Sequence, residues 1–99
     1  MKYLQKTIWN TKSDVKPVDI VVIVAEINDR RVTISEETST SSQQVSCNSD
    51  KLKEALDVHN DVELMNELEK CFGNTCGYDI ARQFMEDNNI EYDWWGGSN

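Results

Sequence analysis

The sequence predicts a small α+β protein in which an antiparallel sheet packs against about three helices. Two observations support this fold class, and a third bears on the number of domains. Segments with the two-residue period of β-strands dominate the first third of the chain, and apolar residues at helical spacing recur through residues 48–87. A chain of 99 residues suits one domain and is short for two, so residues 1–99 are expected to form a single domain.

Three strands are expected in the N-terminal third. Residues 3–9 alternate in character and form the first strand. Residues 18–27 are rich in Val and Ile, whose branched side chains suit a pleated surface, and they form a central second strand. Asn28 and Asp29 tolerate the left-handed conformation of a tight hairpin, so residues 31–35 are expected to return as the third strand.

The next stretch is rich in Ser, Thr and Gln and shows no helical period. Residues 36–46 are therefore predicted to form an exposed loop, flexible over residues 37–46, with a short strand at residues 44–47 as an alternative. Residues 96–99, with the sequence Gly-Gly-Ser-Asn, are predicted to be a flexible tail.

Three helices are expected between these polar segments. Asn48 or Ser49 can cap the first, and Asn60 with Glu63 three residues later fits a weaker form of the capping box that opens the second. The third is expected from about residue 78 to residue 87. The apolar residues expected to face the sheet are Leu52, Ala55 and Leu56 in the first helix, Val62, Met65, Leu68 and Phe72 in the second, and Ile80, Ala81, Phe84 and Met85 in the third.

The residues after the third helix return to a period of two. Ile90, Tyr92 and Trp94 would share one face, so residues 90–95 are expected to form a last strand whose aromatic rings close the core. Trp95 falls on the other face by the same alternation. It is therefore predicted to be exposed.

The net charge of −8 is concentrated in the second half of the chain. Residues 1–53 hold eight Lys or Arg against seven Asp or Glu, whereas residues 54–99 hold two against eleven. A surface of this kind repels DNA, RNA and anionic lipid, and it complements a basic protein. The alternative is that the charge serves only solubility.

No segment is expected to enter a membrane. The most apolar run, residues 20–25, is bounded by Asp19 and Glu26 and is far shorter than the roughly 20 residues that a spanning helix needs. Residues 1–6 carry positive charge without a following apolar region, so no secretory signal is expected. These features predict a cytoplasmic protein, placed in the host cytoplasm if its source is a virus, with reduced cysteines.

Residue types used in catalysis and metal binding are present, but not at the spacing that these functions require. His59 is the only histidine, and no nucleophile signature accompanies it. Cys71 and Cys76 form one close pair, but zinc would also need Cys47 and His59, which lie far away in the sequence. No glycine-rich phosphate-binding loop occurs. We therefore predict no enzyme activity, no cofactor and no metal site.

In size, acidity and lack of a catalytic signature, the chain resembles phage-encoded inhibitors of host nucleic-acid-handling or defence proteins, and bacterial immunity proteins that neutralise nuclease toxins. The first resemblance implies an acidic face that mimics nucleic acid and docks on a basic protein. The second implies a module that docks through the aromatic residues 92–95, and a small metal-dependent or hydrolytic enzyme is a further alternative. A monomer or a homodimer is expected. The residues predicted to bind the partner are Glu54, Asp57, Asp61, Glu63, Glu67, Glu69, Glu86, Asp87, Asp93 and Trp95.

Overall fold

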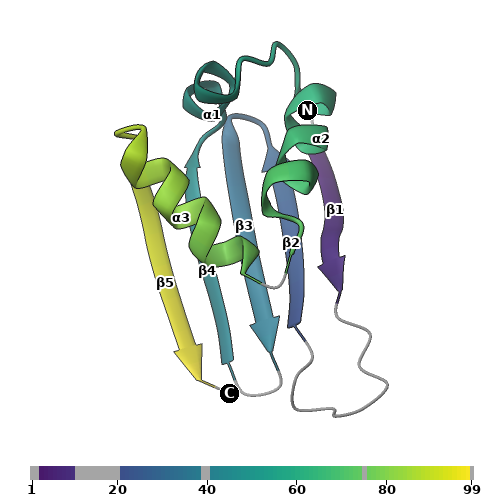
Figure 1. Ribbon diagram of the computed structural model, residues 1–99, viewed down its shortest axis with the longest axis vertical. Helices are drawn as coiled ribbons and strands as arrows, with labels where there is room; N and C mark the ends of the chain where they lie inside the picture. The colour runs from purple at the N-terminus through teal and green to yellow at the C-terminus, as the bar shows by residue number, and fades with distance from the viewer. Residues whose placement is uncertain (1–2, 11–20, 39–40, 75, 99) are drawn as a thin grey trace.

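The computed structural model describes residues 3–10, 21–38, 41–74 and 76–98. In chain order the elements are β1 (Tyr3–Asn10), β2 (Val21–Asn28), β3 (Arg31–Thr38), β4 (Ser41–Asn48), α1 (Ser49–Leu56), α2 (Asp61–Phe72), α3 (Gly77–Asp87) and β5 (Tyr92–Ser98). All five strands form one antiparallel sheet in the order β1-β2-β3-β4-β5, which confirms the predicted α+β class (Figure 1).

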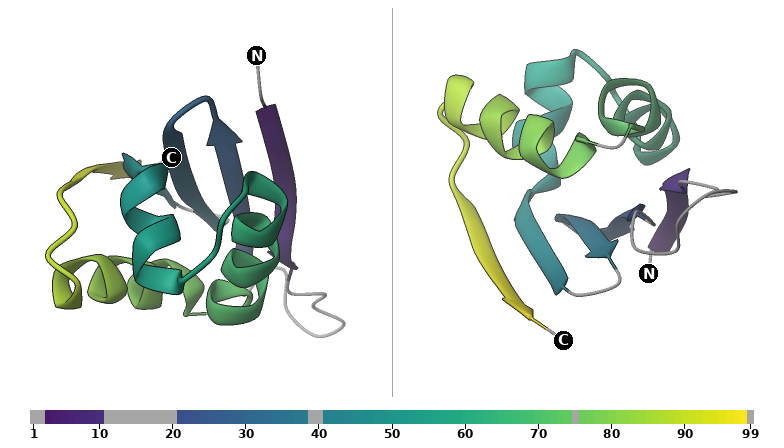
Figure 2. Two further views of the ribbon diagram at one scale, coloured as in Figure 1. Left: turned by 90° about the horizontal axis from the view of Figure 1, so that it is seen from above. Right: turned by 60° about the horizontal axis from the view of Figure 1, so that its bottom comes forward.

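The helices form a second layer on one face of the sheet (Figure 2). The helix α2 lies against β1 and β2, while α3 lies against β3 and β4. No described element covers the opposite face, which we call the open face. The core therefore lies between the two layers, and the buried apolar residues that form it are Ile8, Ile23, Ala25, Ile27, Val32, Ile34, Val45, Cys47, Leu52, Leu64, Met65, Leu68, Phe72, Tyr78, Ala81, Met85 and Ile90.

The predicted hairpin is confirmed. The strands β2 and β3 pair without interruption from Val21 opposite Thr38 to Asn28 opposite Arg31. Asp29 has a φ of 59°, the left-handed conformation that a tight turn requires. The first three residues of the predicted second strand, 18–20, lie outside the described residues.

The predicted loop at residues 36–46 is wrong where the structure describes it. The strand β3 continues to Thr38, and β4 begins at Ser41 and pairs along its length with both β3 and β5. Polar residues are stable in this strand because one face of an antiparallel sheet can remain in water while the other is buried. In β4, Val45 and Cys47 are fully buried under the helices.

The predicted flexible tail is also wrong for residues 96–98. These residues belong to β5, where they pair with residues 41–43 of β4. A Cβ on Gly96 would lie 2.9 Å from the Cβ of Gln43, so this close approach of β4 and β5 requires glycine.

The helix starts follow the predicted caps. The Asn48 side chain accepts a hydrogen bond from the backbone N–H of Asp50 at 2.8 Å, and α1 begins immediately after it. The Asn60 side chain accepts from the N–H of Glu63 at 2.9 Å. The Glu63 carboxylate in turn accepts from the N–H of His59 at 2.9 Å, one residue earlier than the standard capping box.

Two residues of the predicted helical stripes face solvent instead of the sheet. Val62 is 63% exposed and Ile80 is 40% exposed, whereas Leu64 and Tyr78 are fully buried. Each exposed residue lies two positions from a buried one, which places the two side chains about 200° apart around the helix.

None of the described helices is long and apolar enough to span a bilayer.

Two buried ionisable groups are expected to lower the free energy of unfolding at alkaline pH. Burial raises the pKa of the Cys47 thiol from 9.0 to about 12, against a smaller lowering by Arg31. Burial is also the main reason that the pKa of Tyr78 is raised from 10.0 to about 12. Both groups stay neutral in the folded chain at a pH where they ionise in the unfolded chain. Their contribution to stability is therefore complete below pH 9 and is lost as the pH rises toward 12.

We expect the free energy of unfolding to fall above pH 9 by about 1.4 kcal/mol per pH unit for each group between its two pKa values. Urea unfolding followed by circular dichroism at several values between pH 8 and pH 11 measures this slope. The substitution Cys47→Ala should reduce the slope above pH 9, and Tyr78→Phe should reduce it above pH 10. The same slope in both variants and the parent would contradict this assignment.

Candidate functional site

The acidic residues predicted to bind a partner lie mainly on the helix layer, which comprises α1, α2, α3 and the segments joining them (residues 49–87). The helix layer carries ten carboxylates against four Lys or Arg. Eight of the ten predicted binding residues belong to it: Glu54, Asp57, Asp61, Glu63, Glu67, Glu69, Glu86 and Asp87. The other two, Asp93 and Trp95, lie on β5, so the predicted set divides between two regions of the molecule.

Among the described residues, three of the predicted carboxylates form ion pairs within the fold. They are Asp61 with Lys53 at 2.7 Å, Glu69 with Lys6 at 2.7 Å, and Asp93 with Arg31 at 2.6 Å. The Lys53–Asp61 pair links α1 to α2 and is mostly buried. The other two pairs join α2 to β1 and β5 to β3. These carboxylates therefore hold elements together in addition to any role at the surface.

Other predicted carboxylates accept hydrogen bonds and remain exposed. The Glu86 carboxylate accepts from the Tyr92 hydroxyl at 2.7 Å, and the Asp87 carboxylate accepts from the Gln83 amide at 2.9 Å. The Glu63 carboxylate accepts the backbone hydrogen bond that opens α2. Within the described part of the chain, none of the ion pairs or side-chain hydrogen bonds involves Glu54, Asp57 or Glu67.

The aromatic end of the chain is more exposed than predicted. Trp95 is 60% exposed, which confirms its predicted position on the outer face, but Trp94 is also 49% exposed and does not close the core. Instead, the Arg82 guanidinium lies 5.2 Å from the centre of the Trp94 ring and 6.0 Å from that of Tyr92. Arg82 was not predicted to take part in this region. Arg82 is the single arginine of residues 54–99, the acidic second half of the chain. This is the only signal in the sequence that points to Arg82.

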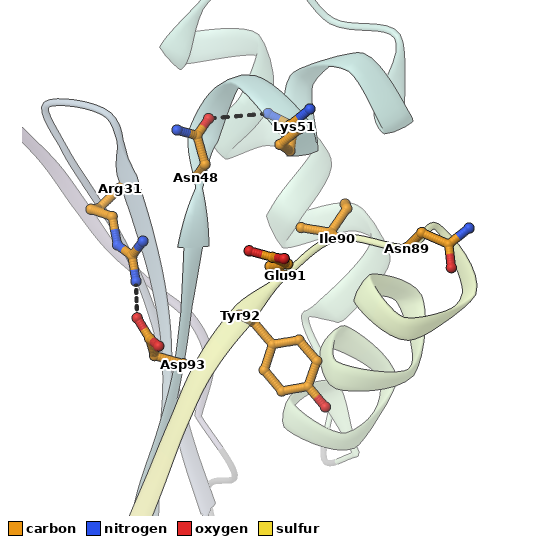
Figure 3. A pocket seen from close by; sticks show the side chains of 8 residues that line it. All are labelled: Arg31, Asn48, Lys51, Asn89, Ile90, Glu91, Tyr92 and Asp93. Carbon is orange, nitrogen blue, oxygen red and sulfur yellow. Dashed lines mark hydrogen bonds and ion pairs between the residues drawn. The ribbon is translucent and has the colours of Figure 1, made fainter.

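An open hollow of about 770 Å³ lies between the start of β3, the end of β4, the start of α1 and the start of β5. Figure 3 shows Arg31 and Asp93 joined on one side of β5, with the Tyr92 ring on the other. The lining contains two cations and two carboxylates, so it selects no single charge on a ligand. The residues that line it are Arg31, Asn48, Lys51, Asn89, Ile90, Glu91, Tyr92 and Asp93.

The cysteines and the histidine do not gather into a site among the described residues. Cys47 is buried, Cys71 is half-buried and Cys76 is exposed, and all three are free thiols. Among the residues that the structure describes, no three His, Cys, Asp or Glu side chains lie close enough to hold a metal ion. Burial raises the pKa of Cys71, and Glu67 raises it further, which keeps this thiol protonated at neutral pH.

No known protein family, curated protein or solved structure matches the chain.

Proposed function

We propose that the chain is a small protein-binding inhibitor whose helix layer docks on a basic groove of a nucleic-acid-handling or defence protein and excludes nucleic acid from it. The excess of carboxylates on the helix layer carries this proposal. Of its four cations, Lys53 is paired with Asp61 and Arg82 is packed on aromatic rings. With ten carboxylates against four cations, the helix layer has a net formal charge of −6 whichever of these contacts form. Such a field accelerates capture of a basic partner.

The charge is asymmetric between the two layers. The described strands and the β2–β3 turn carry three Lys or Arg against five carboxylates, whereas the helix layer carries four against ten. A basic partner is therefore attracted to the helix layer more strongly than to the open face. This asymmetry would orient the chain before contact is made.

The contact is centred on the carboxylates that have no ion-pair partner in the described part of the fold. Glu63 and Glu67 lie one turn apart on α2, and so share one side of that helix. Glu54 and Asp57 lie at the end of the neighbouring α1. Neutralising these residues leaves the three ion pairs of the described residues intact. Glu63→Gln also keeps an oxygen that can accept the hydrogen bond from the His59 N–H, so docking is tested apart from folding.

The decisive experiment compares two variants, each of which removes three negative charges from one of the two layers. The test variant is Glu54→Gln/Glu63→Gln/Glu67→Gln, and the matched control is Glu26→Gln/Asp29→Asn/Glu37→Gln on the sheet layer. The immobilised parent captures partners from a lysate of the source organism, or of its host if the source is a virus. The association rate with the captured protein is then measured for each variant, together with a gel shift of that protein on nucleic acid.

We expect the helix-layer variant to associate about tenfold more slowly at low salt and to release the nucleic-acid site, while the control behaves as the parent does. Parent binding should also weaken toward 1 M salt, where the Debye length is about 3 Å. Equal losses in both variants would show that only total charge matters. Unchanged binding and inhibition in the test variant would refute docking through the helix layer.

A further inference from the structure

The two edges of the sheet differ in how they meet a further strand. At one edge, β1 carries Lys6 and a bulge between Thr7 and Trp9, two devices that discourage strand addition. At the other edge, β5 pairs in a regular register with β4. Asp93 is the one charged residue of β5, and the strand contains no proline. No described strand lies beyond β5 (Figure 1). The outer edge of β5 is therefore the more accessible of the two.

The side chains of β5 point alternately to the two faces of the sheet. Trp94 lies opposite buried Val45 and faces the helices, whereas Trp95 lies opposite Gln44 and, like Asp93, faces the open side. The Trp94 ring already carries the Arg82 guanidinium. Among the described residues no cation or aromatic ring stacks on Trp95. The protein thus packs a guanidinium on one indole and leaves the other accessible.

Charge selects the kind of strand that this edge would accept. Residues 83–98 contain four carboxylates, and two cations, Arg31 and Arg82, contact β5, so this edge keeps an excess of negative charge. The Asp93 side chain remains 81% exposed although it pairs with Arg31. A second copy of this chain would bring the same negative charge against itself, whereas a cationic strand is attracted.

We propose that the outer edge of β5 accepts, by strand addition, an extended segment that carries arginine at alternate positions. Residues opposite Asp93 and Trp95 in an added strand lie two apart and share the open face. One guanidinium would then stack on the Trp95 indole, and the next would pair with the Asp93 carboxylate. Main-chain hydrogen bonds to β5 supply the remaining affinity. This inference rests on the proposed basic partner and names the segment by which it is held.

Two synthetic peptides of equal composition test the proposal on the full chain. The peptide TRTRTRT places its arginines on one face of a strand, whereas TRRTTRT does not, and both are acetylated and amidated. Amide chemical shifts and calorimetry report where and how tightly each binds. We expect TRTRTRT to shift the amides of residues 92–98 and to bind several-fold more tightly than TRRTTRT. N-methylation of TRTRTRT at alternate residues should abolish binding, because it removes main-chain donors.

The matched variants remove one exposed aromatic residue from either edge. We expect Trp95→Ala to weaken binding of TRTRTRT by about 3- to 30-fold, the range that a lost cation–π contact implies. Tyr3→Ala removes a half-exposed ring from the β1 edge and should leave binding unchanged. Circular dichroism checks that both variants keep the fold.

Several results would overturn the proposal. These are equal binding of the two peptides, shifts confined to the helices, no binding at ~1 mM peptide, or self-association of the chain that Trp95→Ala abolishes. A captured partner that tolerates Trp95→Ala but is lost by the helix-layer variant would remove strand addition and leave helix-layer docking in place. If the peptide binds at β5 and the captured partner is unaffected by the helix-layer variant, strand addition is supported and docking through the helix layer is removed.

Discussion

Replacing Phe72 with Ala is expected to lower the free energy of unfolding by about 3–5 kcal/mol. The Phe72 side chain is buried at the end of α2, and its ring meets the ring of Phe84 edge-on with centroids 5.8 Å apart. Its removal leaves a cavity between the helix layer and the sheet. Because a domain of this size has a stability of about 5–15 kcal/mol, the loss is a large part of the total. Urea unfolding monitored by circular dichroism measures it.

The matched control is Val62→Ala on the same helix. The sequence pattern assigned Val62 to the same apolar stripe, but its side chain lies mostly in solvent. We expect its replacement to change the free energy of unfolding by no more than about 0.5 kcal/mol. A loss at Val62 comparable to that at Phe72 would contradict the observed orientation of α2.

The substitution Gly77→Ala is expected to destabilise the fold by about 1–3 kcal/mol or more. A Cβ at Gly77 would lie 1.8 Å from the backbone oxygen of Phe72 and 2.9 Å from its carbonyl carbon. These are backbone atoms, so the clash is relieved only if the connection between α2 and α3 moves. Helix propensity alone predicts the opposite sign, because Ala is favoured over Gly in a helix by about 1 kcal/mol.

The sign of the change in stability therefore decides between the two effects. Thermal and urea unfolding of Gly77→Ala would be compared with those of Cys76→Ala, the adjacent substitution. Cys76 is exposed and its side chain makes no capping hydrogen bond, so we expect a change within about 0.5 kcal/mol. An increase in stability for Gly77→Ala would show that α2 and α3 do not approach as closely as described.

Local signals in the sequence predicted most of the elements. The turn at Asn28 and Asp29 and the caps at Asn48 and Asn60 depend on residues within three or four positions of one another. Their hydrogen bonds form inside a single turn of chain, so their residue types alone indicate them. Alternation along one strand likewise indicated that Trp95 is exposed, although the same alternation wrongly buried Trp94.

The sequence predicted which part of the chain carries the negative charge, but not which of its carboxylates are available to a partner. The sequence locates the carboxylates on the helix layer, but their partners lie at distances along the chain that no local pattern indicates. Asp61 pairs with Lys53 from the preceding helix, and Glu69 pairs with Lys6 from the first strand. Which carboxylates are available to a partner thus depends on how α2 packs against α1 and β1.

Composition and spacing were sufficient for the α+β class, the hairpin, the helix starts and the concentration of negative charge. Tertiary packing was needed to make the Ser- and Gln-rich residues 41–48 a strand, to turn Val62 and Ile80 outward, and to place β5 at an open edge. The physical reason is that strand pairing joins residues distant in sequence, and a polar strand is stable only where a covered neighbour and an open face are both present. Helix caps and turns need no such partner.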